Sequence, residues 1–404
     1  MDSRRRGAIF LGGLLVLAVA WRAAAGPASR SFPAAAENPA VVALSAGVEH
    51  TCALLDDGMV HCWGNNEAGQ LGTGTTGGPS TPGMVEGIAG ATAIAVGGFH
   101  ACALLADGRV KCWGANLAGQ LGHEAEILPS KPVVIQGIAG ATALAAGGTH
   151  TCALLEGGTV RCWGSNVSGQ LGRPPAKEAG VAQEVPGLAG ATALSAGVVH
   201  TCALVAGGRV RCWGSNLHSQ FGDGTTASSS RPVAVASLAG AVSVAAGGFH
   251  TCALMADGRA KCWGANESGQ LGNGVNILRA STPVKVAVTN RVVAVGAGLA
   301  HTCALLVDGR VRCAGRNGAG QLGGGTDALE SVDPLPVSGN ATATALAVGG
   351  HHTCALLTDH TVRCWGANDS GQLGDGTTIS SPAPRAVVGL RQQERAPGHS
   401  AAKP

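Results

Sequence analysis

The sequence predicts an all-β protein, a seven-bladed β-propeller with four-stranded antiparallel blades. A unit of 50 or 51 residues recurs seven times over residues 41–390, and each copy contains two cysteines ten residues apart. Each unit also contains four short apolar runs bounded by Gly, Pro, Asn or Asp, which indicates strands separated by turns. Four strands in every unit of this length are typical of a propeller, and the units leave no room for the paired helices of a helical repeat.

The N-terminal segment has the composition of an export signal. Three arginines at positions 4–6 precede an apolar run from Ala8 to Trp21, and Ala23 and Ala25 fit the small-residue pattern of a cleavage site. The run is shorter than the roughly 18–20 residues of a membrane-spanning helix, which favours cleavage over a retained anchor. We expect a signal peptide over 1–25, a short linker over 26–40, the propeller over 41–390 and a disordered tail over 391–404. The mature chain is then secreted, periplasmic or held at the cell surface, without a membrane span.

The charge balance argues against nucleic-acid binding. The full chain has a formal net charge of +3, and residues 1–25 contain four arginines and one aspartate, which already sum to +3. The mature chain is therefore close to neutral. Because affinity for nucleic acid depends on neutralised phosphates, this class of partner is not expected.

Within each unit, the two cysteines are symmetric about a three-residue loop, which predicts a β-hairpin. In the first unit the loop is Asp56–Gly58, with Cys52 and Cys62 equally distant from its centre. Such loops take a type I turn followed by a left-handed residue, normally glycine. The seventh unit has His360 at the glycine position, and histidine is among the residue types enriched at positive φ.

The hairpin register places the two cysteines of each unit directly opposite one another. Opposed Cα atoms lie about 4.5–5.5 Å apart in such a ladder, which lies within the roughly 4.4–6.8 Å range of disulfides. Zinc is the competing interpretation, but structural zinc sites use shorter C-x₂₋₄-C spacings, and a redox C-x-x-C motif is absent. We therefore predict seven disulfides within hairpins: Cys52–Cys62, Cys102–Cys112, Cys152–Cys162, Cys202–Cys212, Cys252–Cys262, Cys303–Cys313 and Cys354–Cys364.

The same register places His50 opposite Gly64, a pairing that recurs in every unit. A ring of equivalent histidines could suggest a metal site, but equivalent positions in seven blades are too dispersed for one ion. We expect instead that each histidine forms a hydrogen bond within its own blade, and we predict no metal and no cofactor. The set comprises His50, His100, His150, His200, His250, His301 and His352.

Three further repeated features have structural explanations. Amides at Asn66 and Gln70 lie beside glycines, where they can satisfy the backbone of a tight corner, although a repeated ligand site is the alternative. The tryptophan after the second cysteine is expected to pack between blades, and Ala314 in its place predicts a packing gap in unit six. Basic residues opposite Ala53 and its equivalents are expected to form a solvated face, although a band for anionic polymers is the alternative.

The repeated motif GxxHTCALxxDGxVxCWGxNxxGQLG resembles the regulator of chromosome condensation repeat family over residues 41–390. The resemblance implies a seven-bladed propeller. Members of that family include a guanine-nucleotide exchange factor for the small GTPase Ran and an exported bacterial inhibitor of β-lactamase, so the resemblance leaves function open. This chain differs from the nuclear member in its export signal, its cysteine pairs and the lack of a long insertion between blades.

No catalytic motif stands apart from the repeat, so we predict a non-enzyme. G-x-S-x-G, H-E-x-x-H and a Walker lysine are absent. The units differ most in the segment that follows each GQLG motif, and rigid blades with divergent loops are typical of binding scaffolds. We therefore predict an exported, monomeric scaffold for a protein partner, with neutral drift of the loops as the alternative. A nucleotide exchange factor, a polysaccharide- or envelope-binding propeller and a hydrolase are the other functional classes. The candidate partner-binding residues are Glu124, Glu126, Arg173, Lys177, Arg279, Asp327 and Glu330.

Overall fold

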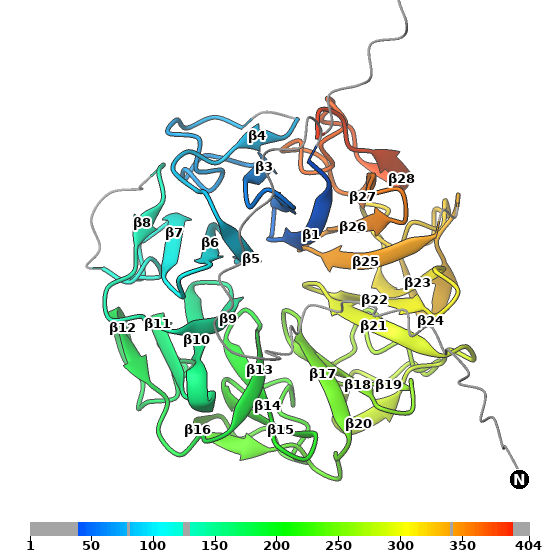
Figure 1. Cartoon of the computed structure of the whole chain (residues 1–404). Helices are drawn as coiled ribbons and strands as arrows, with labels where there is room; N and C mark the ends of the chain where they lie inside the picture. Colours follow the sequence, from blue (N-terminus) through cyan, green and yellow to red (C-terminus); the bar gives the residue numbers. More distant parts are fainter. Residues whose placement is uncertain (1–38, 79–80, 124–129, 340–341, 391–404) are drawn as a thin grey trace, which may run out of the picture.

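The computed structural model describes residues 39–78, 81–123, 130–339 and 342–390. These residues form a closed ring of seven four-stranded antiparallel sheets around a central channel (Figure 1). The predicted signal peptide and tail, and all but two residues of the predicted linker, lie outside the described residues. No helix in the described part of the chain is long and apolar enough to cross a membrane.

Each blade consists of four strands that are consecutive in the sequence, with the first strand nearest the channel. Blade one contains β1 (Val41–Ala46), β2 (His50–Leu55), β3 (Val60–Gly64) and β4 (Gly83–Met84). Blade two contains β5 (Ala91–Val96), β6 (His100–Leu105), β7 (Val110–Gly114) and β8 (Val133–Val134). Blade three contains β9 (Ala141–Ala146), β10 (His150–Leu155), a 3-10 turn η1 (Glu156–Gly158), β11 (Val160–Asn166) and β12 (Ala176–Glu184).

The remaining blades repeat this order. Blade four contains β13 (Ala191–Ala196), β14 (His200–Val205), β15 (Arg209–Gly214) and β16 (Ser229–Ala234). Blade five contains β17 (Ala241–Ala246), β18 (His250–Met255), β19 (Ala260–Ala265) and β20 (Arg279–Lys285). Blade six contains β21 (Val292–Ala297), β22 (His301–Leu306), β23 (Val311–Arg316) and β24 (Glu330–Pro336). Blade seven contains β25 (Ala343–Val348), β26 (His352–Leu357), β27 (Val362–Gly366) and β28 (Ser381–Ala386).

The central hairpin of each blade has the predicted register. Cys52 lies opposite Cys62, His50 opposite Gly64 and Ala53 opposite His61. The loop closes with Gly58 N–H donating to Leu55 O at 3.0 Å, and Gly58 has a φ of 79°. His360 takes the same role in blade seven with a φ of 63°.

All seven predicted disulfides are present. The Cα atoms of each pair are 4.0–4.1 Å apart, closer than we expected. The reason is the position in the ladder. Leu55 and Met59 form a hydrogen-bonded pair, since Leu55 N–H donates to Met59 O. Hydrogen-bonded and non-hydrogen-bonded pairs alternate along an antiparallel ladder, so Cys52 and Cys62, three pairs further along, form a non-hydrogen-bonded pair. The two strands are closest at such pairs.

The hydrophobic core is divided among the interfaces between blades. In the first interface, Leu54, Val60 and Leu71 of blade one pack with Ile94 and Trp113 of blade two. The ring closes without exchange of a strand between the two ends of the chain, because each sheet contains four consecutive strands. Blades seven and one are joined instead by a shared core and by Trp63 Nε1–H, which donates to Gln372 O at 2.9 Å.

Candidate protein-binding face

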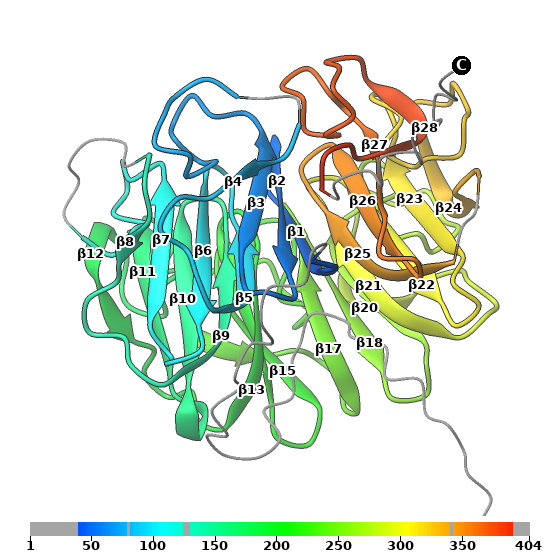
Figure 2. The ribbon, with the colours of Figure 1, turned by 45° about the horizontal axis from the view of Figure 1, so that its top comes forward.

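The two faces of the ring are built from different connections. Because the strands of a blade alternate in direction, the connections from first to second strand and from third to fourth strand meet on one face, here called the loop face. In blade one these are residues 47–49 and 65–82. The second-to-third hairpins and the links between blades form the opposite, hairpin face. Figure 2 shows the long β3–β4 and β27–β28 connections rising from the same side of the ring.

The corner after the third strand is held by its own amides. Asn66 Oδ1 accepts a hydrogen bond from Leu71 N–H at 2.9 Å, and Asn66 Nδ2–H donates to the carbonyls of Thr75 and Gly77. Gln70 Oε1 accepts from Ala68 N–H at 2.8 Å. The Asn and Gln bonds to backbone N–H groups recur in all seven blades, so these amides are structural, as expected.

The buried histidines join neighbouring blades, which corrects the expectation of a bond within one blade. His100 Nε2 lies 2.8 Å from Thr151 Oγ1, and the Thr151 hydroxyl donates its proton to Gln120 O. Since that hydroxyl has one proton, it accepts from the His100 Nε2–H, which fixes the neutral tautomer. Five further histidine–threonine pairs repeat the contact, at 2.8–3.0 Å.

Burial keeps these histidines neutral. Loss of solvation lowers the pKa of His50, His150 and His250 to about 4. In the other four members the pKa is lowered to about 3, by burial and by repulsion from neighbouring histidines. Across the described residues, no group of three or more His, Cys, Asp or Glu side chains is arranged to hold a metal ion.

The repeated tryptophans are buried between blades and cannot serve as sugar-stacking platforms. Trp163 Nε1–H donates to Gln120 O of the preceding blade at 2.9 Å, and Trp63, Trp113, Trp213, Trp263 and Trp365 repeat this bond. At Ala314, Pro334 lies where the indole lies elsewhere. A Cβ on Gly272 would meet Ala314 Cβ at 3.1 Å and Pro334 Cγ at 3.3 Å. The predicted gap in unit six is therefore at least partly filled by proline.

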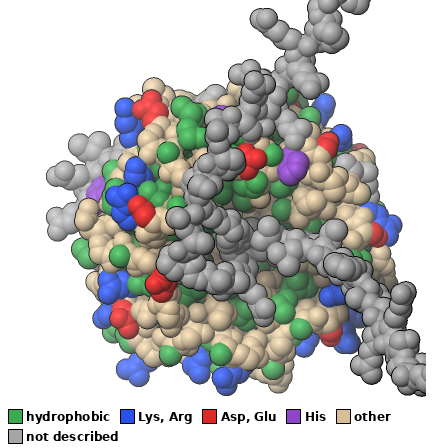
Figure 3. Space-filling view, in the orientation of Figure 1, with side chains coloured by type: hydrophobic (Ala, Val, Ile, Leu, Met, Phe, Trp, Pro, Cys, Tyr) green, Lys and Arg blue, Asp and Glu red, His purple; other side chains and the backbone are tan. Residues whose placement is uncertain are grey.

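Three of the hairpin loops carry an ion pair. Asp107–Arg109, Asp257–Arg259 and Asp308–Arg310 form ion pairs across the hairpin loops. On the face shown in Figure 3, basic and acidic side chains lie side by side around the periphery. This mixture gives no extended field of one sign there.

The loop face carries most of the exposed apolar side chains. Of the seventeen large hydrophobic side chains exposed in the described residues, ten lie in its connections and two, Val307 and Val388, in those of the hairpin face. The residue that follows the repeated Trp-Gly-x-Asn is Leu117 in blade two, Val167 in blade three and Leu217 in blade four, with exposed fractions of 83%, 61% and 67%. Phe99 and Phe249, in the first connections of blades two and five, are also exposed.

These five residues are here called the apolar arc: Phe99, Leu117, Val167, Leu217 and Phe249. The corner of blade four packs beside the first connection of blade five, where the ring centroids of His218 and Phe249 are 4.9 Å apart. Each blade from two to five contributes at least one member to the arc. At the positions equivalent to Leu117, blades one, five and seven carry Glu67, Glu267 and Asp369. Sequence reasoning missed this arc because its members are single residues, 18 to 50 positions apart along the chain.

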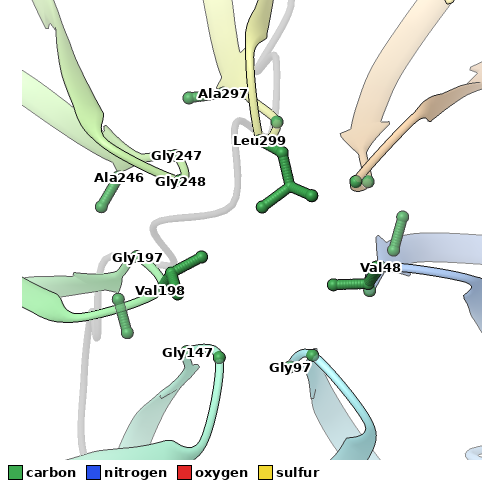
Figure 4. Close-up of a pocket in the computed structure, with 18 of the residues that line it drawn as sticks. Val48, Gly97, Gly147, Gly197, Val198, Ala246, Gly247, Gly248, Ala297 and Leu299 are labelled. Atoms are coloured by element: carbon green, nitrogen blue, oxygen red, sulfur yellow. The ribbon is translucent and has the colours of Figure 1, made fainter. Parts of the chain in front are cut away.

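The channel mouth also opens on the loop face. A cavity of about 170 Å³ is lined by the ends of the seven inner strands and the turns that follow them. Figure 4 shows Val48, Val198 and Leu299 projecting into this space, whereas Gly97, Gly147 and Gly247 contribute only backbone. Among the described residues that line it, none has an ionisable side chain.

The predicted partner-binding residues are spread over the loop connections of several blades. Arg173 donates from Nε to Glu184 O within blade three. Arg279 is exposed at the start of β20, and Asp327 and Glu330 are exposed in blade six. Glu124 and Glu126 lie outside the described residues, as does the side chain of Lys177. Within the described residues, no member of this set contacts a member from another blade.

Comparison with known proteins identifies the repeat. An RCC1-like domain matches residues 130–402, and the regulator of chromosome condensation (RCC1) repeat matches residues 41–70, 91–120 and 57–104. The chain belongs to the regulator of chromosome condensation repeat family. Among solved structures, Prp20p from Saccharomyces cerevisiae has a TM-score of 0.71 at 22% identity and covers 87% of this chain and 88% of its own. Human WBSCR16 has a TM-score of 0.75 at 23% identity and covers 82% of this chain and 94% of its own.

Curated relatives match over shorter stretches. The zebrafish (Danio rerio) protein RCC2 homolog is 39% identical over 21% of this chain and 18% of its own length. The mitochondrial RCC1 domain-containing protein RUG3 of Arabidopsis thaliana is 33% identical over 28% and 26%, and the human E3 ubiquitin-protein ligase HERC2 is 38% identical over 25% and 2%. The matched segments therefore span at most about a quarter of these relatives, and the relatives' activities do not transfer with them.

Proposed function

We propose that this chain is an exported scaffold that binds a protein partner on its loop face, and that it has no catalytic activity of its own. The observation that carries the proposal is the apolar arc, five exposed hydrophobic side chains that follow one another over four blades of the same face. Exposed apolar side chains that gather on one face of a protein indicate an interaction site. Protein binding also fits the family, since Prp20p is known for its binding to Gsp1p and histones.

The arc and its neighbouring residues have the composition of a protein interface. All five members of the arc are apolar and two are phenylalanines, and the carboxylates of Glu67 in blade one and Glu267 in blade five lie at its two ends. Protein interfaces combine an apolar centre with a polar rim. The partner should therefore present an apolar patch with basic residues at its edge. The seven disulfides and the amide-held corners keep the arc rigid, which reduces the conformational entropy lost on binding.

Export is supported by the cysteine chemistry. All fourteen cysteines are paired within hairpins. Disulfides of this kind form and persist in oxidising compartments. Fractionation of the producing cells, followed by mass spectrometry of the mature N-terminus, tests this part of the proposal. A processed N-terminus near Ala25 in the exported fraction is the expected result, and an unprocessed, thiol-containing chain in the cytosol would contradict export.

The binding site is tested with two matched variants. In the arc variant, Leu117, Val167 and Leu217 are replaced by serine, and in the control, Val307 and Val388 on the hairpin face are replaced by serine. All five side chains are exposed, so each substitution should change the free energy of unfolding by less than about 0.5 kcal/mol. Partners are captured with the wild-type chain, identified, purified and titrated by calorimetry against all three proteins.

We expect the purified partner to bind the wild type and the control alike and to bind the arc variant at least about tenfold more weakly, a loss of about 1.4 kcal/mol. Equal affinity for all three proteins would overturn the arc as the binding site. Concentration-dependent self-association of the wild type, lost in the arc variant, would show that a second copy covers the arc and would overturn the proposal of a different partner.

A further inference from the structure

Blade four departs from the other six at two residues of its corner, where Ser219 replaces a glycine and Phe221 replaces a leucine. The position occupied by Gly69, Gly119, Gly169, Gly269, Gly320 and Gly371 elsewhere is Ser219 here, within the sequence HSQFG. Ser219 has a φ of 62°, in the left-handed region. A residue with a Cβ is strained there, and such strain in a native structure is concentrated at functional sites.

The serine also requires space that the other corners do not have. A Cβ added to Gly69 would lie 2.7 Å from Ser130 Cα, and one added to Gly320 would lie 2.5 Å from Pro382 Cα. Both contacts are with the beginning of the fourth strand of the next blade or the residues just before it. A cavity of about 480 Å³ lies between the corner of blade four, which contains Ser219, and β20 of blade five.

This cavity is lined by polar groups. The residues that line it include four with hydroxyl groups, Ser219, Thr225, Thr226 and Ser281, and one arginine, Arg279. The Ser219 side chain is fully buried, and its Oγ has no hydrogen-bond partner. A buried hydroxyl without a partner is costly, so this atom has an unused hydrogen bond for a ligand. Arg279 is exposed and forms no ion pair with any described residue.

The nearby acidic group is already engaged. Asp223 Oδ1 accepts hydrogen bonds from Asn216 Nδ2–H at 3.3 Å and from Thr225 N–H at 3.0 Å. The Thr225 hydroxyl also donates to this carboxylate. The donors of the cavity that are not engaged with Asp223 are therefore the Ser219, Thr226 and Ser281 hydroxyls and the Arg279 guanidinium, a set that matches a carboxylate, which accepts bonds only.

From this arrangement we infer that the cavity between blades four and five binds the carboxylate of an acidic side chain presented by the protein partner. The inference rests on the proposed function, because the cavity belongs to the loop face and its Ser219 is two residues from Leu217 of the apolar arc. Arg279 forms a bidentate ion pair with the carboxylate, and the Ser219 hydroxyl donates a third hydrogen bond from the buried wall. The site thus selects partners with a glutamate or aspartate at one edge of their apolar patch.

A capped glutamate tripeptide tests the site without the partner, with the isosteric glutamine tripeptide as the control ligand. Each peptide is titrated into isotope-labelled protein, and the chemical shifts of the backbone amides are followed by NMR. The proteins compared are the wild type, Arg279→Gln, Ser219→Gly and Arg231→Gln. Arg231 is an exposed arginine of blade four that does not line the cavity, so its substitution makes the same change in charge. Ser219→Gly restores the residue of the other six corners and should not impair folding.

We expect the glutamate peptide, and not the glutamine peptide, to shift the amides of residues 219–227 and 279–281 in the wild type and in Arg231→Gln. The shifts should be lost in Arg279→Gln and weakened at least about threefold in Ser219→Gly. Saturation by acetate with the same pattern would show that a free small carboxylate suffices, and the identified partner is then titrated against the same variants. No shift of these amides with any carboxylate, or equal partner affinity for wild type and Arg279→Gln, would overturn the inference. The second outcome, with binding still lost in the arc variant, would leave the proposed function standing.

Discussion

At the scale of single residues, the interface between blades one and two lacks a contact that the other six interfaces have. Ala101 occupies the position of the threonine, so His50 has no hydroxyl partner, and both of its ring nitrogens are buried without a hydrogen bond. The same alanine leaves Gln70 O with the donor Trp113 and no threonine. Buried polar groups without partners reduce stability.

Ala101→Thr should therefore stabilise the protein. The new hydroxyl would accept from His50 Nε2–H and donate to Gln70 O, as Thr151 does for His100 and Gln120. The expected gain in the free energy of unfolding is about 1 kcal/mol, measured by urea denaturation. Thr151→Val is the reciprocal change and should cost about 1–3 kcal/mol, because it leaves the His100 N–H unpaired. A destabilised Ala101→Thr variant would show that the interface does not use this contact.

At the scale of elements, the cysteine hairpin is the repeated unit of covalent stabilisation. Each disulfide closes a loop of eleven residues, from Cys252 to Cys262 in blade five. Closing a loop of that size lowers the conformational entropy of the unfolded chain, which stabilises the folded protein by about 2–3 kcal/mol. The double variant Cys252→Ala/Cys262→Ala should lose about this amount in chemical denaturation while the other six links persist.

Peptide mapping under non-reducing conditions checks the pairing itself. We expect seven linked peptides, each joining the two cysteines of one hairpin. Links between blades, or free thiols in most units of the exported protein, would contradict both the structure and the export proposal.

Exchange of a variable connection tests whether the loops beyond the arc contribute to partner choice. Residues 123–131, HEAEILPSK, and residues 223–231, DGTTASSSR, have the same length. Replacing the first by the second removes Glu124 and Glu126 and leaves the strands of blade two unchanged. We expect slower association with the partner, because charges at the rim of an interface act mainly on encounter and specificity, with no appreciable fall in the melting temperature. Unchanged association kinetics would mean that this connection varies by drift.

The elements of this protein could be predicted from the repeat, whereas its interaction surface could not. The ten-residue spacing determines which residues of a hairpin face each other, so Cys52–Cys62 and His50–Gly64 follow from the sequence alone. The partner of His100 could not be predicted in this way, because Thr151 belongs to another blade and the contact depends on how blades pack. Ser219 is visible as a substitution in the sequence, but the cavity beside it depends on the position of β20.

At the scale of the whole molecule, the seven buried histidines make the ring sensitive to acid. Their pKa values in the folded state, about 3 to 4, lie below the ordinary value of 6.5. The unfolded chain therefore binds more protons below about pH 6.5, and stability is lost as the pH falls from there towards about 4. Each histidine contributes a slope of about 1.4 kcal/mol per pH unit within that range.

Urea denaturation between about pH 7 and pH 4.5 measures this effect. We expect a steep fall in the free energy of unfolding, and a shallower slope in a folded His150→Gln variant. A stability that stays constant over this range would show that the histidines are not buried in neutral form.

The central claim is that the partner covers the loop face, and amide hydrogen exchange of the complex tests it most directly. Exchange is compared between the free chain and the chain saturated with purified partner. The account predicts slower exchange at residues 97–99, 115–119, 165–169, 215–219 and 247–249, and unchanged exchange in the hairpin loops 106–108 and 307–309. Slower exchange in those hairpin loops, with none along the apolar arc, would contradict the account.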